Sequence, residues 1–215
     1  DGRGGPDLRT GHLCRADGGA WEDVVDDCRA TVGKEALGHE PTSAFKRAIL
    51  MAEHSPIRDI VIRWKWSGIK SWVATHFSRH KFEKFIRTQR SDRTGTDRDG
   101  ARQDALVDFV GSANAQQLLD AWRKRLCVGQ VSPETREYAE DLKMALHETE
   151  PELSDALVPP CVYRCGCPEL QSCRYFDRLL ANEPGIGSHD LRFRYAAYND
   201  LFWQERKGDA DGERA

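Results

Sequence analysis

A stretch of alternating apolar and polar side chains is the strongest constraint on how this chain folds. Within residues 59–66, every second position is apolar, namely Ile60, Ile62, Trp64 and Trp66. Successive side chains of a β-strand point to opposite faces of a sheet. The stretch is therefore predicted to be a strand with one face in the core and the other exposed.

Helical periodicity and turn residues mark the segments around this strand. Ser43 is predicted to cap a helix that ends at His54-Ser55-Pro56, because the residue before a proline favours an extended backbone. Gly68 is predicted to turn the chain into a second helix, which starts at Ile69 and runs to Arg79.

The second half of the chain predicts another strand and then helices. Residues 105–110 form an apolar run of strand length, and residues 94–100 before it have the composition of a loop. Asn114 is predicted to cap a helix that continues to Leu126, and Pro133 to open the next helix. Pro159-Pro160 is predicted to end the regular region, and the tail over 161–215 is predicted to contain a final amphipathic piece around Leu191 to Trp203.

Length and composition limit the class of protein. The 215 residues are 39% hydrophobic and 31% charged, which suits one domain, or at most two small ones. A net charge of −3 excludes a uniformly basic nucleic-acid binder. We expect a catalytic domain over residues 1–160, with a mobile segment at 1–20, and a cysteine-containing extension over 161–215 packed on the same domain.

The apolar runs and the cysteines point to a compartment. No apolar run approaches the roughly 20 residues of a membrane span. The sequence begins Asp-Gly-Arg-Gly-Gly-Pro, without the apolar region of a secretory signal. Seven cysteines, an odd number, favour reduced thiols in this context. We therefore expect a cytoplasmic protein.

Cations concentrate between residues 63 and 93. Arg79-His80-Lys81 follows the predicted helix, and Thr88-Gln89-Arg90 comes soon after it. Such a local excess indicates an anionic ligand, although a solvated basic surface has the same composition. His76 lies on the apolar stripe of the helix, where a histidine is either a satisfied core residue or a ligand contact.

Five segments together resemble the flavin-dependent thymidylate synthase family. In chain order they are His54-Ser55-Pro56, Arg79-His80-Lys81, Thr88-Gln89-Arg90, Asn114–Arg125 and Ser132–Arg136. They match the family's His-x-Ser/Thr-Pro, Arg-His-Arg and Ser-x-Arg motifs, its Asn-Ala-Arg-Ser-Leu helix and its Ala-Gln-x-Glu-Ile-Arg segment. The resemblance is collinear over roughly residues 25–155 and is nearest to the family's viral and antibiotic-pathway members.

The resemblance implies a fold and a reaction. The fold is α/β, with a small sheet flanked by helices, in a homotetramer whose subunits share active sites. The reaction is reductive methylation at C5 of a uracil nucleotide, using FAD, NADPH and 5,10-methylenetetrahydrofolate. UMP is the expected substrate, with dUMP also accepted. Transfer of a hydroxymethyl group instead of a methyl group remains an alternative.

The resemblance also implies roles for individual residues. Arg125 is the expected catalytic cation, which stabilises charge on the pyrimidine carbonyls; a cation that extends from a helix C-terminus into solvent is the alternative. The expected substrate-binding residues are His76, Glu83, Thr88, Gln89, Arg90 and Ser91. The expected cofactor-binding residues are His54, Ser55, Arg79, His80, Lys81 and Asp120.

The sequence departs from the family pattern at several points. Lys81 replaces an arginine, which removes a bidentate fork but keeps the charge. Thr88 stands for the usual serine. The segment before Asn114 is short and lacks the family's other phosphate-binding arginine. Four residues are candidates to replace it: Arg93, Arg98, Arg102 and Arg164.

The cysteines and tryptophans allow further interpretations. Cys161, Cys165, Cys167 and Cys173 lie close enough in sequence to bind zinc, but their spacing favours structural thiols and we predict no metal. Cys127 reads as a small buried hydrophobe. A nucleic-acid-binding module is the alternative to an enzyme, with Trp64, Trp66 and Trp72 as stacking platforms; their spacing fits core packing better.

Overall fold

The alternating stretch forms part of β2, an inner strand of a four-stranded antiparallel sheet. The computed structural model describes residues 12–15, 21–95 and 97–212. The strand order is β1-β2-β4-β3. The strands are β1 (His12–Arg15), β2 (Val61–Lys70), β3 (Glu83–Ile86) and β4 (Leu106–Asn114). The predicted mixed α/β fold with a small sheet is thus confirmed, and β4 extends the predicted 105–110 strand by four residues.

The predicted turn at Gly68 is wrong. β2 continues through this glycine to Lys70, and the pairing with β4 shifts register between Trp66 and Ile69. Gly68 has a φ of +71°, which a residue without a side chain adopts at little cost. The glycine therefore supplies a β-bulge within the strand, so that Ile69 stays in the sheet and the next helix begins later.

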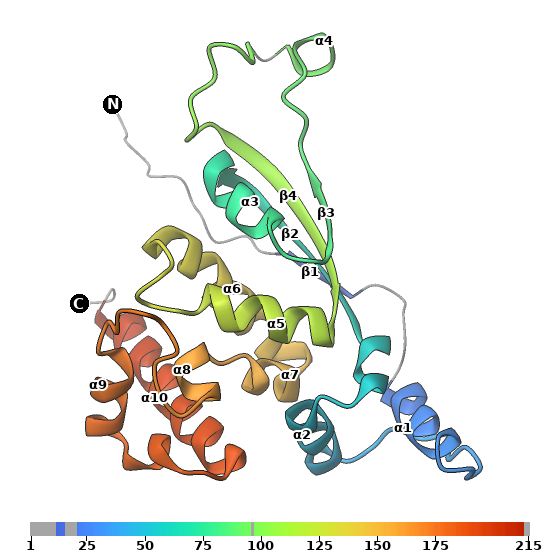
Figure 1. Cartoon of the computed structure of the whole chain (residues 1–215). Helices are drawn as coiled ribbons and strands as arrows, with labels where there is room; N and C mark the ends of the chain where they lie inside the picture. Colours follow the sequence, from blue (N-terminus) through green and yellow to red (C-terminus); the bar gives the residue numbers. More distant parts are fainter. Residues whose placement is uncertain (1–11, 16–20, 96, 213–215) are drawn as a thin grey trace.

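Two layers of helices accompany the sheet (Figure 1). The first part of the chain supplies α1 (Trp21–Ala30), α2 (Ser43–Ala52), a 3₁₀ turn η1 (Ser55–Asp59), α3 (Ser71–Ser78) and α4 (Ser91–Thr94). The second part supplies α5 (Ala115–Arg125), α6 (Pro133–Thr149), α7 (Pro151–Ala156), α8 (Pro160–Tyr163), α9 (Tyr175–Asn182), η2 (Pro184–Gly187) and α10 (Leu191–Gly212).

Of the three helix starts predicted from Ser43, Asn114 and Pro133, the last two are confirmed. The Asn114 side chain accepts a hydrogen bond from the Gln117 N–H, and Gln117 returns one to the Asn114 N–H, which completes a capping box. Ser132 caps α6. The predicted cap Ser43 is wrong, because Thr42 accepts from the Phe45 N–H and Ser43 is already helical.

Three short elements escaped the sequence analysis. β3 (Glu83–Ile86) and α4 (Ser91–Thr94) lie in the part of the chain between the predicted helix and the predicted loop at 94–100, where the sequence analysis assigned no element. β3 is an edge strand whose Phe85 and Ile86 are 62% and 39% exposed, so it lacks an alternating pattern. β1 falls inside the segment expected to be mobile; the rest of that expectation, at 1–11 and 16–20, lies outside the described residues.

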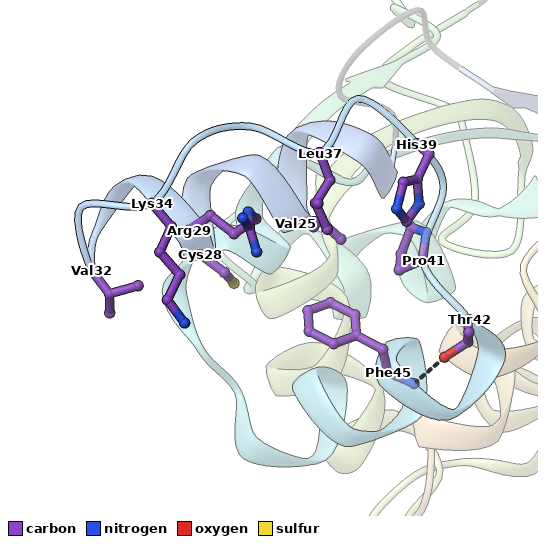
Figure 2. A pocket seen from close by; sticks show the side chains of 10 residues that line it. All are labelled: Val25, Cys28, Arg29, Val32, Lys34, Leu37, His39, Pro41, Thr42 and Phe45. Carbon is purple, nitrogen blue, oxygen red and sulfur yellow. Dashed lines mark hydrogen bonds between the residues drawn. The ribbon is translucent and has the colours of Figure 1, made fainter.

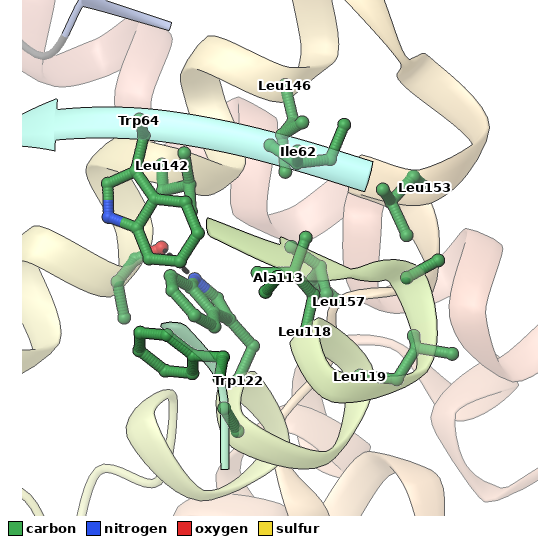
Figure 3. Packing of buried hydrophobic residues seen from close by; sticks show 14 of the residues in the cluster. Ile62, Trp64, Ala113, Leu118, Leu119, Trp122, Leu142, Leu146, Leu153 and Leu157 are labelled. Atoms are coloured by element: carbon green, nitrogen blue, oxygen red, sulfur yellow. Dashed lines mark hydrogen bonds between the residues drawn. The ribbon is translucent and has the colours of Figure 1, made fainter. Parts of the chain in front are cut away.

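The main core lies between one face of the sheet and helices α3, α5 and α6. Its centre is aromatic: Trp64 and Trp66 are 1% and 2% exposed, and the Trp64 ring meets the Trp122 ring edge-on at 5.5 Å. Figure 3 shows Trp64 above Trp122, with aliphatic side chains of α5, α6 and α7 beyond them. The core interpretation of Trp64 and Trp66 is confirmed, so neither ring is available to stack on a nucleic acid.

The predicted end of regular structure at Pro159-Pro160 is wrong, because helices α8 and α9 follow it. The amphipathic piece predicted around Leu191 to Trp203 is confirmed as part of α10. Helices α8, α9 and α10 build a second hydrophobic cluster around Val162, Tyr195 and Phe202. Lys143 of α6 is fully buried beside it and donates to Ser154 O at 2.6 Å and to Asn199 Oδ1 at 2.7 Å. Burial lowers the pKa of Lys143 from 10.5 to about 7. No helix in the described ranges is both long and apolar enough to cross a membrane.

Replacing Gly111 tests the tight contact between β4 and the aromatic core. A Cβ at this position would lie 2.2 Å from a ring carbon of Trp64, which is itself locked in the core. We expect Gly111→Ala to lower the free energy of unfolding by about 1–3 kcal/mol, because overpacking displaces the indole. Urea denaturation measures the change. Ser112→Ala, at the next position of β4, is the control, and equal stabilities for the two variants would contradict the packing argument.

Candidate functional site

The C-terminal ends of α3 and α5 meet and bring Arg125 against the 76–80 segment. Arg125 is the last residue of α5, and its Nε donates to His80 Nε2 at 2.7 Å. Its Nη2 donates to the carbonyl of His76, also at 2.7 Å. We call Arg125, His76 and His80 the Arg125 cluster. Arg125 is therefore in direct contact with His80 and His76, which lie 45 and 49 positions before it and belong to a different motif segment.

His76 connects this cluster to the start of α6. Its Nδ1 lies 2.9 Å from Oγ1 of Thr135, and Ser132, the cap of α6, donates its hydroxyl to the same oxygen at 2.9 Å. Thr135 is fully buried. The segment 132–136, singled out by its motif, thus contacts the predicted site through a hydroxyl. Burial and the charges of Arg125 and Arg79 lower the pKa of His76.

His80 is held neutral by its surroundings. Burial, and then the charges of Arg125 and Lys84, lower its pKa from 6.5 to about 4. Because Nε2 accepts from Arg125, the proton of the neutral imidazole sits on Nδ1. Lys84 fixes the turn beneath the ring, since its Nζ donates to the carbonyls of His80 and Phe82 at 2.6 and 3.0 Å. His80 is thus an oriented hydrogen-bond donor at neutral pH.

Arg125 keeps donors for a ligand. Burial and the charge of Arg79 lower the pKa of Arg125, but a guanidinium remains protonated at any pH that a folded protein tolerates. The hydrogen bonds to His76 and His80 use two of its five N–H groups. The planar fork is held from one side by the protein, so its remaining donors point in a defined direction.

A second cationic site lies near the tip of the β3–β4 pair. A cavity of about 200 Å³, which we call the tip pocket, is lined by Ser71, Ile86, Arg87, Thr88, Gln89, Arg90, Arg98 and Val107. Among the described residues, three arginines and no carboxylate line it. The Thr88 hydroxyl accepts from the Arg90 N–H at 3.2 Å and shapes the turn. The arrangement suits a ligand with a phosphate or another compact anion.

A carboxylate of the chain itself engages one of these cations. Asp92 accepts two hydrogen bonds from Arg90, at 3.0 Å to Nε and 2.7 Å to Nη2. Both side chains are more than half exposed, so the pair is screened by solvent and weak. An anionic ligand with two oxygens can take the place of the Asp92 carboxylate on the same guanidinium fork.

The tip pocket and the Arg125 cluster are separate in this chain. Arg125 does not line the tip pocket. Figure 1 shows α4, which begins directly after Arg90, beyond the far end of the strands, whereas α5 lies toward their other end. Arg90 and Arg125, both expected to contact the nucleotide, therefore do not share a cavity within a single chain.

The remaining predicted residues fall into three places. Arg79 and Lys81 are exposed in the turn between α3 and β3, beside His80. Glu83 pairs with Ser112 on the open face of the sheet, opposite the face that carries the helices. Ser91 is the exposed first residue of α4, next to the tip pocket.

The predicted cofactor residues His54, Ser55 and Asp120 lie toward the other end of α5. His54 and Ser55 are exposed and follow Glu53, whose carboxylate accepts from Gln116 at 2.8 Å and is ion-paired with Arg123. Asp120 accepts from the same Gln116 at 3.3 Å. Roughly 14 Å of helix separates Gln116 from Arg125, so the expected cofactor contacts are spread along α5.

Three cationic residues of the site were not assigned from the sequence. Arg98 was one of four candidates for a missing phosphate contact, and only its place in the tip pocket distinguishes it. Arg102, by contrast, is paired with Asp104 at 3.0 Å. Arg87 lines the tip pocket directly after β3, and Lys84, within β3, donates to the His80 carbonyl. Had the strand been recognised, the alternation of its side chains would have placed these two residues on opposite faces.

The cysteines make no metal cluster in the part of the chain that the structure describes. Cys28, Cys127, Cys161, Cys165, Cys167 and Cys173 are free thiols. Across the described ranges, no group of three or more His, Cys, Asp or Glu residues is arranged to hold an ion. Burial, chiefly, raises the pKa of Cys161 to about 12, which makes this thiol a poor nucleophile. Cys127 is buried, as predicted.

Comparison with solved structures identifies the fold. The chain is similar to the UMP/dUMP methylase PolB from Streptomyces cacaoi bound with 5-Br dUMP, with a TM-score of 0.53 and 13% sequence identity, over 69% of this chain and 94% of PolB. A second PolB structure, bound with 5-Br UMP, has a TM-score of 0.49 at the same identity and coverage. No protein-family profile matches the sequence, and no curated protein matches it significantly. The predicted resemblance is confirmed at the level of fold.

The depressed pKa of His80 predicts a pH dependence of stability. Between pH 6.5 and about 4 the unfolded chain binds a proton at this position and the folded chain does not, so stability falls as the pH is lowered through this window. His80→Gln keeps an acceptor for Arg125 and removes the titration. We expect urea midpoints of this variant to fall less steeply from pH 6.5 to 4 than those of the parent. His189→Gln, at an exposed histidine outside the Arg125 cluster, is the control, and parallel curves for the parent and His80→Gln would contradict the assignment.

Proposed function

We propose that this chain is a flavin-dependent enzyme that reductively methylates C5 of a uracil nucleotide, UMP and also dUMP. The observation that carries the proposal is the contact of Arg125 with His76 and His80, which joins two separate motif segments in a fold like that of a UMP/dUMP methylase. A likeness of fold alone does not specify a reaction, so the argument rests on the chemistry of the two cationic sites.

The tip pocket has the chemistry of a nucleotide phosphate site. Arg90 and Arg98 offer guanidinium forks, and Thr88 a hydroxyl, in a pocket without carboxylates among its lining residues. Phosphate oxygens accept such donors in charge-assisted hydrogen bonds. Under this proposal the phosphate displaces Asp92 from Arg90, and Arg98 takes the part of the arginine that is missing before Asn114.

Arg125 has the chemistry needed at the pyrimidine. Polarising the C5–C6 bond, so that C5 becomes a nucleophile, builds negative charge on the ring carbonyls, and a fixed cation beside them stabilises that charge. The two hydrogen bonds to the 76–80 segment hold the fork in place before substrate binds, so little reorganisation is needed. The Nδ1–H of neutral His80 is a second oriented donor in the same place.

The residues present fit a flavin dinucleotide at the turn after α3. Arg79 and Lys81 are exposed there, and no ion pair of either occurs among the described residues. Such cations suit a diphosphate, and the His80 donor suits a ring carbonyl. When bound, reduced FAD supplies the hydride, NADPH reduces the flavin, and 5,10-methylenetetrahydrofolate supplies the carbon. His54, Ser55 and Asp120 remain proposed contacts at the other end of α5.

The separation of the two sites supports an active site shared between subunits. The tip pocket of one chain would supply phosphate contacts, and the Arg125 cluster of another the pyrimidine contacts, in the proposed homotetramer. Each chain then contributes its tip pocket to one active site and its Arg125 cluster to another. Mixing two inactive variants, one in each half, would restore activity in hybrid oligomers if this arrangement holds.

A direct assay tests the proposal. We expect the purified protein to bind FAD and to convert UMP or dUMP in the presence of methylenetetrahydrofolate and NADPH. Mass spectrometry of the nucleotide product separates a methyl from a hydroxymethyl group, which is the alternative reaction on the same site. A protein that takes up no flavin and converts neither nucleotide would contradict the proposal.

Arg125→Lys is expected to reduce turnover by about 10²–10³-fold. Lysine keeps the charge but cannot hold His80 Nε2 and the His76 carbonyl from one planar fork. We expect flavin absorbance and the thermal melt to remain close to the parent's, because the side chain is only partly buried. Steady-state kinetics and visible spectra measure the two effects. Turnover within about twofold of the parent would show that Arg125 does not act on the pyrimidine.

Arg98→Ala is expected to weaken nucleotide binding by roughly tenfold to a hundredfold, the loss of one hydrogen bond to a charged group. Arg102→Ala is the matched control, because Arg102 is four residues away, exposed and paired with Asp104. Isothermal titration with UMP compares the two variants. Equal losses would contradict the choice of Arg98 among the four candidate arginines.

A further inference from the structure

A separate cavity lies between α1 and α2, away from both cationic sites. Its volume is about 390 Å³, within the range of small-molecule pockets. Ten residues line it: Val25, Cys28, Arg29, Val32, Lys34, Leu37, His39, Pro41, Thr42 and Phe45. Figure 2 shows side chains of α1 and Phe45 of α2 directed toward one another, with the residues of the connecting loop along the remaining side. We call it the α1–α2 cavity.

The walls of this cavity are apolar and partly open to solvent. Val32 and Leu37 are 65% and 45% exposed, which places them among the large exposed hydrophobic residues of the described chain. Phe45 and Cys28 are partly buried against the main core and form the floor. Burial, and then the charge of Asp27, raise the pKa of Cys28, so the thiol stays protonated and adds no charge. Apolar surface of this kind is costly to leave in water.

The charged residues that line the cavity, among those the structure describes, are of one sign. Arg29 and Lys34 are cationic, and no carboxylate lies among the ten lining residues. Acids lie just outside the lining: Asp26 accepts from the Leu37 N–H at 2.7 Å, Glu40 is ion-paired with Lys46, and Asp27 is near Cys28. The cavity therefore complements a molecule with an apolar body and an anionic head group.

The loop that closes the cavity is held in place, so the site is largely formed in advance. Arg29 donates its Nε to the carbonyl of Glu35 at 2.5 Å, and the Lys34 N–H bonds the carbonyl of Arg29 at 3.0 Å. Gly33, with a φ of +70°, makes the turn out of α1. The Nη groups of Arg29 have no recorded partner within the described residues, so its fork retains donors for a ligand. A preformed site binds without the cost of ordering a loop.

We propose that the α1–α2 cavity binds a small amphipathic carboxylate, with its apolar chain against Phe45 and Leu37 and its carboxylate on Arg29 and Lys34. The geometry favours a free small molecule over a protein partner, because the apolar surface is concave and no larger than one small ligand. The proposal is independent of the reaction assigned to the Arg125 cluster.

Isothermal titration of the full chain with decanoate tests this site. We expect one equivalent to bind with a dissociation constant on the order of 10⁻⁵–10⁻⁴ M, as the size of the ligand allows. Decyltrimethylammonium, which has the same chain and a cationic head, should bind at least roughly tenfold more weakly. Equal binding of the two would show a non-specific apolar surface and overturn the proposal.

Two substitutions locate the binding. Lys34→Glu reverses an exposed charge whose side chain makes no hydrogen bond or ion pair within the described residues. We expect this substitution to weaken the binding of decanoate roughly tenfold. Lys65→Glu, at an exposed lysine of β2, is the matched control and should leave binding within about twofold. Leu37→Asn should also weaken binding by removing part of the wall. The proposal would be overturned if the parent did not bind decanoate, or if the two lysine variants had equal effects. It would also be overturned if the parent were a dimer that Leu37→Asn dissociates, because a second copy would then cover the cavity.

Discussion

The packing of two indole rings on one face of β2 determines where the candidate site forms. Trp64 and Trp66 lie two residues apart, so both point to the same side of the sheet, and Gly111 on the neighbouring strand leaves the space that the Trp64 ring fills. Phe77 of α3 and Trp122 of α5 then pack on these rings, at 4.8 Å from Trp66 and 5.5 Å from Trp64. The C-terminal turns of α3 and α5 are thereby fixed beside each other. The cations that follow those aromatic residues in sequence meet because the aromatic residues themselves are locked together.

The C-terminal ends of α3 and α5 also explain why several cationic side chains can lie close together at this place. A helix C-terminus carries partial negative charge and carbonyls without intrahelical partners, and α3 and α5 both present theirs at this place. Arg125 satisfies one of those carbonyls, that of His76 in the last turn of α3. Arg79 and Lys84 add further positive charge, which His80 accommodates by staying neutral. The arrangement therefore has a structural basis that needs no ligand, while only two of the five N–H groups of Arg125 are used by these contacts.

The sequence predicted those parts of the fold whose signals are local. The alternation through Trp66 and the side-chain cap at Asn114 each specify an element without reference to the rest of the chain, and both elements formed as expected. Gly68 misled because a glycine serves a turn and a bulge equally well, and only the pairing with β4 decides between them. Edge strand β3 was missed because its sequence has no alternation of apolar and polar residues, and only its pairing with β4 defines it as a strand. Arg98 remained one of four candidates for the same reason: a pocket is a property of the fold, and loop residues carry no periodicity that reports which of them faces it.

The distance between the tip pocket and the Arg125 cluster has a consequence for the proposed function. The tip of the β3–β4 pair carries the arginines Arg87, Arg90 and Arg98, and no carboxylate occurs among the described residues that line its pocket. Within the described residues β3 pairs with β4 alone, and its Phe85 and Ile86 remain exposed. Exposed apolar residues on an unpaired edge strand are a liability in an isolated subunit. A second chain that brings its own Arg125 toward this tip would cover that edge and complete the nucleotide site in one step. The extended tip of the β3–β4 pair keeps the tip pocket away from the Arg125 cluster of the same chain. In an oligomer, this tip is the part that would reach the Arg125 cluster of another chain.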